Sequence, residues 1–155
     1  MKDLLLKQML FEFWANTELL KKIKEANPLN PRALFLFSHI LSAGSMWLSR
    51  LKNEDLTATL FQERTAEECE TLLLSTKKGG ENYFETVTVD GVNKIIEFTS
   101  PVDSTKRSIN ASDAILHVVH HSSYHRGQIV TLLKGSVEQL PLITYMPFAS
   151  KEIES

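Results

Sequence analysis

The sequence predicts an all-α protein, a four-helix bundle that forms a single domain over residues 1–155. Four long segments repeat apolar residues at the three- and four-residue spacing of a helix that buries one face. Prolines, glycines and capping residues bound these segments and mark where each helix begins or ends. An apolar content of 43% is enough for the core of one domain of this length. Four long helices in so small a domain are expected to pack as a bundle.

The first two predicted helices cover residues 4–26 and 31–52 and are separated by prolines. Asp3 is expected to cap the first helix, and Pro28 ends it because proline clashes with the preceding helical turn. An Asn-Pro pair at Pro31 begins the second helix, with the asparagine as its cap. The first helix repeats apolar residues at helical spacing: Leu5, Met9, Phe13, Leu20 and Ile23. One side of the second helix carries Phe35, His39, Ser42 and Met46.

A third helix is predicted over residues 66–84, after a polar connection of residues 53–64. Thr65 and Glu68 have the spacing of a capping box, which sets the start of this helix. The glycine pair at Gly79 weakens the second half, because each glycine disfavours a helix by about 1 kcal/mol relative to alanine. The helix is therefore expected either to stop at the glycines or to continue past them.

A change of periodicity after the third helix predicts a small β-hairpin. Residues 94–99 are rich in β-branched side chains and partly alternate, and residues 105–109 are expected to return as the partner strand. The hairpin lies in a connection of more than 20 residues before the last long helix. So long a crossover means that the third and fourth helices need not be antiparallel neighbours.

The last long helix is predicted over residues 112–134. Asn110 or Ser112 is expected to cap it, and Gly135 stands at the usual C-terminal stop position. Residues 136–155 contain two prolines and a few apolar residues, and one further short helix is expected there at most.

Charge and composition exclude several classes of function. The formal net charge is −2 and the isoelectric point is near 6.2, so no nucleic-acid partner is expected. No apolar segment approaches the roughly 20 residues of a membrane-spanning helix, and no secretory signal is visible. The single cysteine, Cys69, excludes an intramolecular disulfide and a thiolate metal cluster. A cytoplasmic protein without a membrane partner is therefore expected.

Four of the five histidines fall between residues 117 and 125, and their spacing favours a metal site. His121 and His125 project from one helix face a single turn apart, so their imidazoles can share an ion. His117 is also one turn from His121, but it lies about 12 Å along the axis from His125. Both cannot reach an ion through bonds of ~2.1 Å. The ligand pair is therefore 117/121 or 121/125, and His120 points elsewhere.

His39 lies in the apolar middle of the second predicted helix, where a buried imidazole needs a polar partner. A metal ion shared with the last helix would satisfy it. Three histidine ligands leave an open coordination position, as catalytic metal sites do. The pattern also fits a hydrogen-bonded core histidine at position 39 and a solvated or interfacial face at 117–125. Imidazole suits several divalent metals, so the metal's identity stays open.

Three motifs resemble the DinB/YfiT-like family of four-helix proteins, named for DNA-damage-inducible members. The most specific motif is Tyr124-His125-Arg126-Gly127-Gln128-Ile129, preceded by His121. Phe13-Trp14-Ala15-Asn16 resembles the end of the family's first-helix pattern, and Ser38-His39-Ile40-Leu41 resembles its second helix. The resemblance covers about residues 5–135.

This resemblance implies an up-down-down-up bundle, a homodimer, and a zinc or nickel ion whose ligands fall on His39, His121 and His125. Characterised relatives include thiol-dependent S-transferases, a mycothiol-dependent isomerase and proteins labelled as metal-dependent hydrolases. The chain departs from the family pattern near its C-terminus, where an aspartate often precedes an aromatic residue and Thr144-Tyr145 stands here.

A metal-dependent enzyme acting on a small molecule is the function expected on this basis. It would be a thiol S-transferase, with a low-molecular-weight thiol as co-substrate, or a hydrolase. Arg126 and Tyr124 are the candidate catalytic residues. Arg126 is expected to pair with a substrate carboxylate or with a carboxylate of the bundle, and Tyr124 to donate a hydrogen bond into the site or to pack. The alternative is a non-catalytic, stress-associated dimer or a thiol- or ligand-binding module in which the metal is structural.

Overall fold

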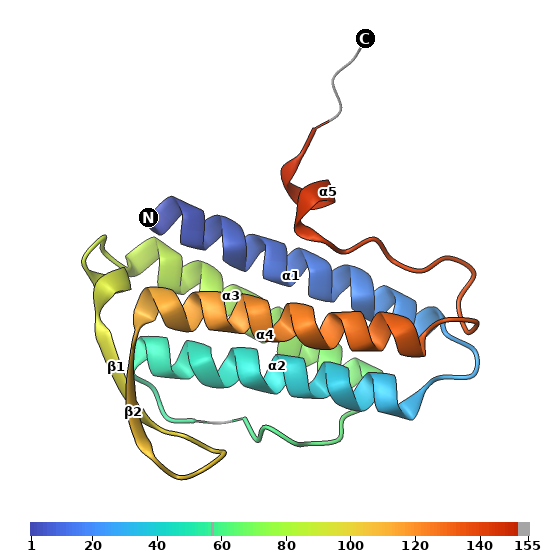
Figure 1. The fold of residues 1–155 in the computed structure, drawn as a ribbon, viewed down its shortest axis with the longest axis horizontal. Helices are drawn as coiled ribbons and strands as arrows, with labels where there is room; N and C mark the ends of the chain where they lie inside the picture. The colour runs from blue at the N-terminus through green and yellow to red at the C-terminus, as the bar shows by residue number, and fades with distance from the viewer. Residues whose placement is uncertain (57, 152–155) are drawn as a thin grey trace.

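The computed structural model describes residues 1–56 and 58–151. The fold is mostly helical with one small antiparallel sheet, so the predicted helical class is confirmed (Figure 1). The long helices are α1 (Lys2–Glu25), α2 (Pro31–Lys52), α3 (Ala66–Thr86) and α4 (Ala111–Leu132), and the shorter elements are η1 (Gly91–Asn93), β1 (Ile95–Thr99), β2 (Lys106–Asn110) and α5 (Tyr145–Ala149).

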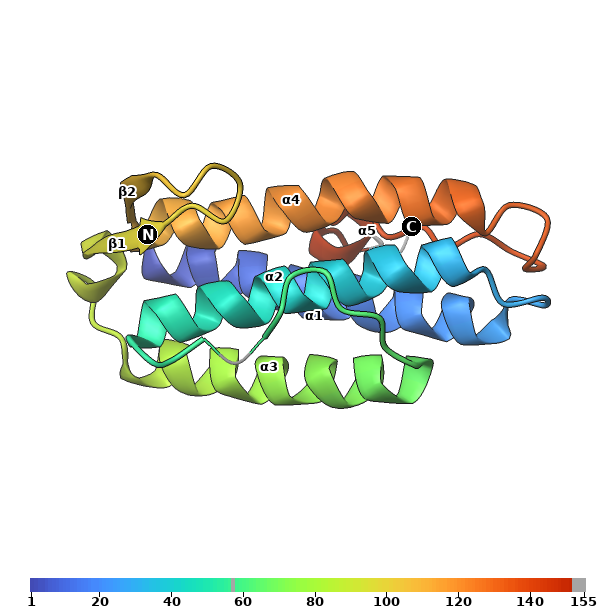
Figure 2. The ribbon, with the colours of Figure 1, turned by 90° about the horizontal axis from the view of Figure 1, so that it is seen from below.

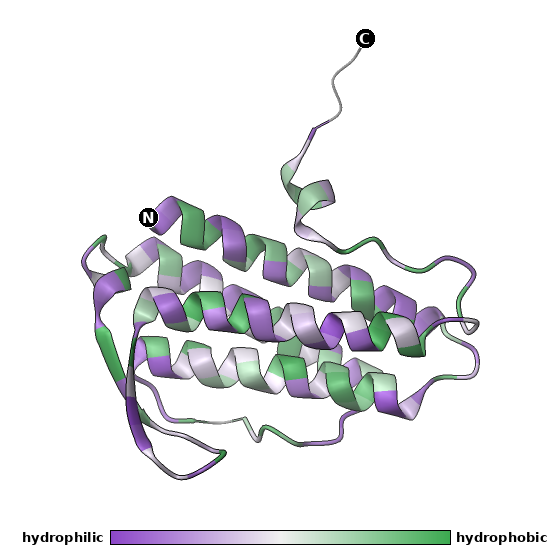
Figure 3. Cartoon of the chain, in the orientation of Figure 1, coloured by the Kyte–Doolittle hydropathy of each residue, from purple (hydrophilic) through white to green (hydrophobic). Residues whose placement is uncertain are grey.

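The four long helices lie side by side, with α3 and α4 on opposite sides of the molecule. Both α1 and α2 pack against each of these outer helices (Figure 2). The connection from α2 to α3 runs back along the molecule before α3 begins, so α2 and α3 point the same way (Figure 2). Apolar and polar residues follow one another along the long helices, which is the pattern of helices that bury one face (Figure 3).

Of the four predicted helix caps, two are present, Asp3 is wrong, and Asn110 stands at the N-cap position of α4 without a side-chain hydrogen bond to the helix. The Asn30 side chain accepts hydrogen bonds from the first backbone N–H groups of α2, and Thr65 and Glu68 form the expected reciprocal capping box. Asp3 does not cap α1, which already begins at Lys2 and has no side-chain cap. Asp3 instead lies in the first turn, where its negative charge favours the positive end of the helix dipole.

The glycine pair does not interrupt α3, which continues to Thr86. A Cβ atom placed on Gly79 would lie 2.8 Å from Cδ2 of Leu48, and one on Gly80 would lie 3.0 Å from Cζ of Phe13. These glycines therefore allow α2 and α1 to approach α3 closely. Tertiary packing outweighs the weak helix propensity of the pair.

The predicted hairpin is confirmed, with bounds shifted by about one residue. Strands β1 and β2 pair antiparallel, with Ile96 opposite Ile109. The Phe98 ring meets the Trp47 ring of α2 edge-on, with centroids 5.0 Å apart. This contact places the hairpin beside the middle helices and makes it one wall of the cavity described below.

The C-terminal part of the chain begins earlier than the sequence indicates, because α4 ends at Leu132 rather than at 134. Gly135 follows in the left-handed region, with φ of 84°, where a glycine carries no Cβ penalty. The tail then runs back beside α1 and α4 and carries the short helix α5 (Figure 1). The Tyr145 ring packs edge-on against Phe11. Residues 152–155 of the predicted tail lie outside the described residues.

Within the described residues, none of the helices combines the length and apolar character needed to cross a lipid bilayer.

Candidate metal centre

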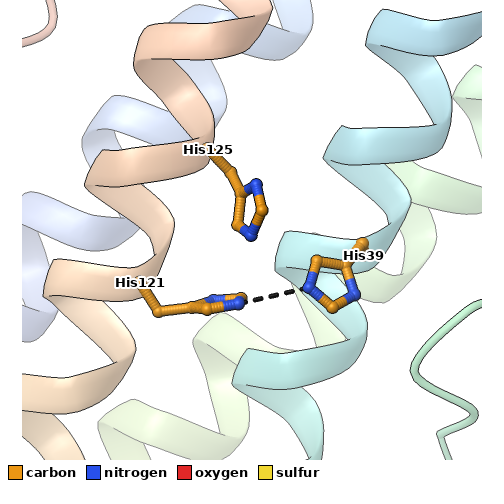
Figure 4. A group of neighbouring side chains, drawn as sticks. All are labelled: His39, His121 and His125. Atoms are coloured by element: carbon orange, nitrogen blue, oxygen red, sulfur yellow. Dashed lines mark hydrogen bonds between the residues drawn. The ribbon is translucent and has the colours of Figure 1, made fainter.

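Three histidines from two helices converge between α2 and α4. His39, His121 and His125 each offer one nitrogen, and these nitrogens all lie within 4.8 Å of one another. The rings point toward one another across the space between the helices (Figure 4). Nε2 of His39 and Nε2 of His121 form a hydrogen bond of 3.2 Å. Of the two pairs that the spacing allowed, 121/125 joins His39 in this cluster, and His117 is not part of it.

Hydrogen bonds on the outer side fix two of these rings. Nδ1 of His39 lies 3.0 Å from the carbonyl oxygen of Leu60, and Nδ1 of His125 lies 2.8 Å from Oε1 of Gln128. A carbonyl or amide oxygen only accepts, so both Nδ1 atoms carry the proton. The Nε2 lone pairs then face the common point, as in metal-binding histidines whose other nitrogen donates to an oxygen.

Burial keeps the inner imidazoles neutral. It lowers the pKa of His121 to about 4, with further lowering from the charges of His125, His39 and His117. The pKa of His39 is also lowered, chiefly by burial, and the Leu60 carbonyl offsets part of this change. Neutral imidazole is the form that binds a metal ion.

The donor set fits one divalent ion. Two nitrogens on a tetrahedral ion with ~2.1 Å bonds lie roughly 3.4 Å apart, close to the 3.2 Å between His39 and His121. The buried Nδ1 of His121 has no hydrogen-bond partner among the described residues, and the hydrogen bond of this ring runs from its Nε2 to Nε2 of His39. The cluster includes no fourth protein ligand from residues 1–56 and 58–151. Three ligands leave room for a substrate or water.

A cavity of about 590 Å³ lies beside the cluster, and both His39 and His121 line it. Its remaining lining is mostly apolar and aromatic, with two arginines, and comes from α2, the hairpin, the connection before α3 and α4. His117 also lines it, with its ring centroid 5.5 Å from that of Trp47. This cavity could not be predicted from the sequence, because the hairpin and the connection carry no helical periodicity.

Arg126 is 2% exposed and its guanidinium is directed at bundle residues. Nη1 donates to the Glu12 carboxylate at 2.6 Å and to Oδ1 of Asn16 at 2.9 Å, while Nη2 donates to Oγ of Ser123 at 2.8 Å. Asn16 is itself buried and donates to Glu12. Of the two partners expected for Arg126, these contacts match the bundle carboxylate.

Tyr124 lies at the edge of the site and is 67% exposed. Its ring meets the His125 ring edge-on, with centroids 5.1 Å apart. No hydrogen bond joins its hydroxyl to any other described residue. His120 lines a different hollow, shared with Arg126, in agreement with its predicted rotation away from the cluster.

The connection between α2 and α3 contributes to the site in a way that sequence reasoning missed. Its Phe61 ring stacks on His39, with centroids 4.8 Å apart and an interplanar angle of 6°. Arg64 donates to Oγ of Ser38 and of Ser42, which ties the connection to α2 on both sides of His39. Gln128 was also missed, although its three-residue spacing from His125 on one helix was a signal for contact.

Comparisons with known proteins give one match. The sequence model of the DinB family matches residues 21–150, which include all three clustered histidines. No curated protein matches the chain, and no solved structure does.

Proposed function

The chain belongs to the DinB family, and we propose that it binds one divalent metal ion, zinc or nickel, through His39, His121 and His125 and acts as a metal-dependent enzyme. The observation that carries this proposal is the convergence of three ring nitrogens within 4.8 Å beside a cavity. The reaction class is that of a thiol S-transferase or a hydrolase acting on a small molecule.

In this proposal the protein positions the histidine rings and the substrate, and the metal ion activates the nucleophile. When bound, the ion lowers the pKa of a thiol or water at its open position and so favours the nucleophilic anion. Leu60 and Gln128 hold the rings of His39 and His125 with their Nε2 atoms turned inward. The cavity beside His39 and His121 holds the molecule to be attacked and limits its contact with water.

The open position favours an enzyme over a structural metal site. Structural zinc sites are almost always closed by four protein ligands, whereas catalytic sites use three and leave one position for substrate. The described residues supply three histidines, and the cavity gives a small molecule access to them. A non-catalytic dimer whose metal ion only stabilises the bundle would need no such cavity.

The candidate catalytic residues take unequal parts in this proposal. Arg126 is assigned a structural role, because its donors are held by Glu12, Asn16 and Ser123. Tyr124 stays a candidate donor to a ligand at the edge of the site.

The helix directions in Figure 2 support an up-down-down-up bundle, which is part of the proposal together with a single domain. The homodimer and the cytoplasmic location also stay predictions.

A turnover assay with controlled metal content tests the proposed function. The zinc-loaded, nickel-loaded and metal-free proteins are incubated with a panel of low-molecular-weight thiols and 1-chloro-2,4-dinitrobenzene, and separately with nitrophenyl esters. We expect metal-dependent thiol conjugation or ester hydrolysis that chelation abolishes and added metal restores. Full metal occupancy without turnover in either assay would favour the structural or ligand-binding alternative.

A further inference from the structure

Arg50 lines the cavity and also a neighbouring hollow that contains Glu54 and Glu97, and it forms no ion pair with either carboxylate. Its guanidinium carbon lies 4.6 Å from the centroid of the Trp47 ring and 4.8 Å from that of Phe98. Nη1 is buried with an exposed area under 1 Å² and has no hydrogen-bond partner among the described residues. Nη2 has a single long contact, 3.5 Å from the carbonyl oxygen of Thr99. The two aromatic rings therefore hold the guanidinium in place while its hydrogen-bonding capacity stays mostly unused.

The cavity is cationic as well as apolar. The ion pairs of the described residues do not include Arg50. The other arginine of the lining, Arg107, donates to the Asp103 carboxylate at 2.6 Å. Among the described residues no aspartate or glutamate lines the cavity. Burial also lowers the pKa of Arg50, which reflects the cost of holding a charge there without a partner.

We propose that the substrate of this site is a small carboxylate with an apolar body. Its carboxylate pairs with Arg50, and its apolar part packs on Trp47 and Phe98, with Met46 and Val102 completing the apolar lining. His39 and His121 line the same cavity, so the opposite end of the molecule extends toward them. That this carboxylate is a substrate rests on the proposed function, whereas its binding to the cavity does not.

A carboxylate fits better than a phosphate. A guanidinium pairs with a carboxylate through short, charge-assisted hydrogen bonds. A phosphate dianion at neutral pH calls for more donors than one uncompensated arginine supplies. Arg107 already faces Asp103 and is not free to be the second cation. The aromatic rings around Arg50 match an apolar group next to the carboxylate.

Trp47 fluorescence in a Trp14→Phe background measures this binding, because the chain has two tryptophans and only Trp47 lines the cavity. The probes are 3-phenylpropanoate, its neutral amide and 2-phenylethylphosphonate, each titrated into metal-free and zinc-loaded protein. We expect the carboxylate to bind about tenfold more tightly than the amide or the phosphonate, with and without zinc. Arg50→Gln should remove this preference and Arg50→Lys should retain part of it. Arg107→Gln, the matched control, should change it less than threefold.

Several results would overturn the inference. Equal binding of amide and carboxylate by the wild-type protein contradicts it whether or not Arg50→Gln folds. If Arg50→Gln and Arg107→Gln lose the carboxylate preference equally, the assignment to Arg50 is wrong. If the phosphonate binds more tightly than the carboxylate, the proposal that the ligand is a carboxylate is wrong. A preference seen only with zinc shows that the carboxylate binds the metal instead. Zinc binding is measured on the same samples, so a carboxylate preference without zinc binding supports this inference while contradicting the proposed function.

Discussion

His39 and Leu60 form a hydrogen bond of 3.0 Å between Nδ1 of the ring and the backbone carbonyl, joining the middle of α2 to the connection before α3. The bond places the ring proton on Nδ1 and leaves the Nε2 lone pair facing His121. Phe61, the next residue, stacks on the same ring. The connection therefore helps to orient His39, and the candidate metal site includes contacts from a segment without regular secondary structure.

Gln128→Leu tests the corresponding bond on α4. The change removes the oxygen that accepts from Nδ1 of His125 at 2.8 Å, so the ring loses its orientation. We expect zinc affinity to fall by roughly 10–100-fold, as when other outer partners of metal-bound histidines are removed. Competition with a chromogenic chelator measures this affinity. Gln128→Glu keeps an acceptor and should bind zinc at least as tightly as the wild type, and an equal loss in both variants would contradict the role given to Gln128.

The stability of the metal-free protein should fall as the pH is lowered from about 6.5 to about 4. Burial lowers the pKa of His121 to about 4 and also lowers that of His39, whereas both rings have a pKa of 6.5 in the unfolded chain. Between these values the unfolded chain binds more protons than the folded one, so acid favours unfolding. The contribution is on the order of 1–2 kcal/mol after allowance for the partial exposure of the rings.

Urea denaturation of the metal-free protein at pH 7.5, 6, 5 and 4.5 measures this dependence. His121→Gln carries no titrating ring at that position, so its stability should decline less over the same interval. A free energy of unfolding that is constant, or that rises as the pH is lowered, would show that His121 is not buried in its neutral form.

Arg126→Met should destabilise the fold by about 3–5 kcal/mol, because it leaves the Glu12 carboxylate buried without its cation. Combining it with Glu12→Leu removes both charges, and this double variant should regain most of the loss. Equilibrium unfolding in urea measures both effects. If the double variant also retains metal binding and turnover, Arg126 has a structural role only, whereas a folded double variant with bound metal and no turnover would show that the reaction depends on Arg126.

Much of the helical framework follows from local sequence signals. The Asn30 cap and the Thr65–Glu68 capping box are short-range hydrogen bonds, so the residue types at those positions predict them. Gly79 and Gly80 show where this reasoning ends. Helix propensity alone makes them a break, and only the contacts of α3 with Leu48 and Phe13 explain why the helix continues.

The histidine cluster could be predicted in part because two of its members share one helix face. The four-residue spacing allowed His121 to pair with His117 or with His125, and the resemblance to the DinB family selected His125. His39 was added because a buried imidazole needs a partner. The Leu60 carbonyl could not be predicted, since any residue supplies a backbone oxygen and no side chain marks it. Arg50 was missed for a related reason, because its environment comes from the hairpin, far away in sequence.

The metal content of three purified proteins tests three-histidine ligation most directly. Wild-type protein, His121→Ala and His120→Ala are loaded with zinc, freed of excess metal by gel filtration and examined by elemental analysis. We expect about one zinc per chain in the wild type and in His120→Ala, and almost none in His121→Ala, because only residue 121 belongs to the cluster. Equal zinc content in the two variants, or no retained zinc in the wild type, would contradict ligation by His39, His121 and His125.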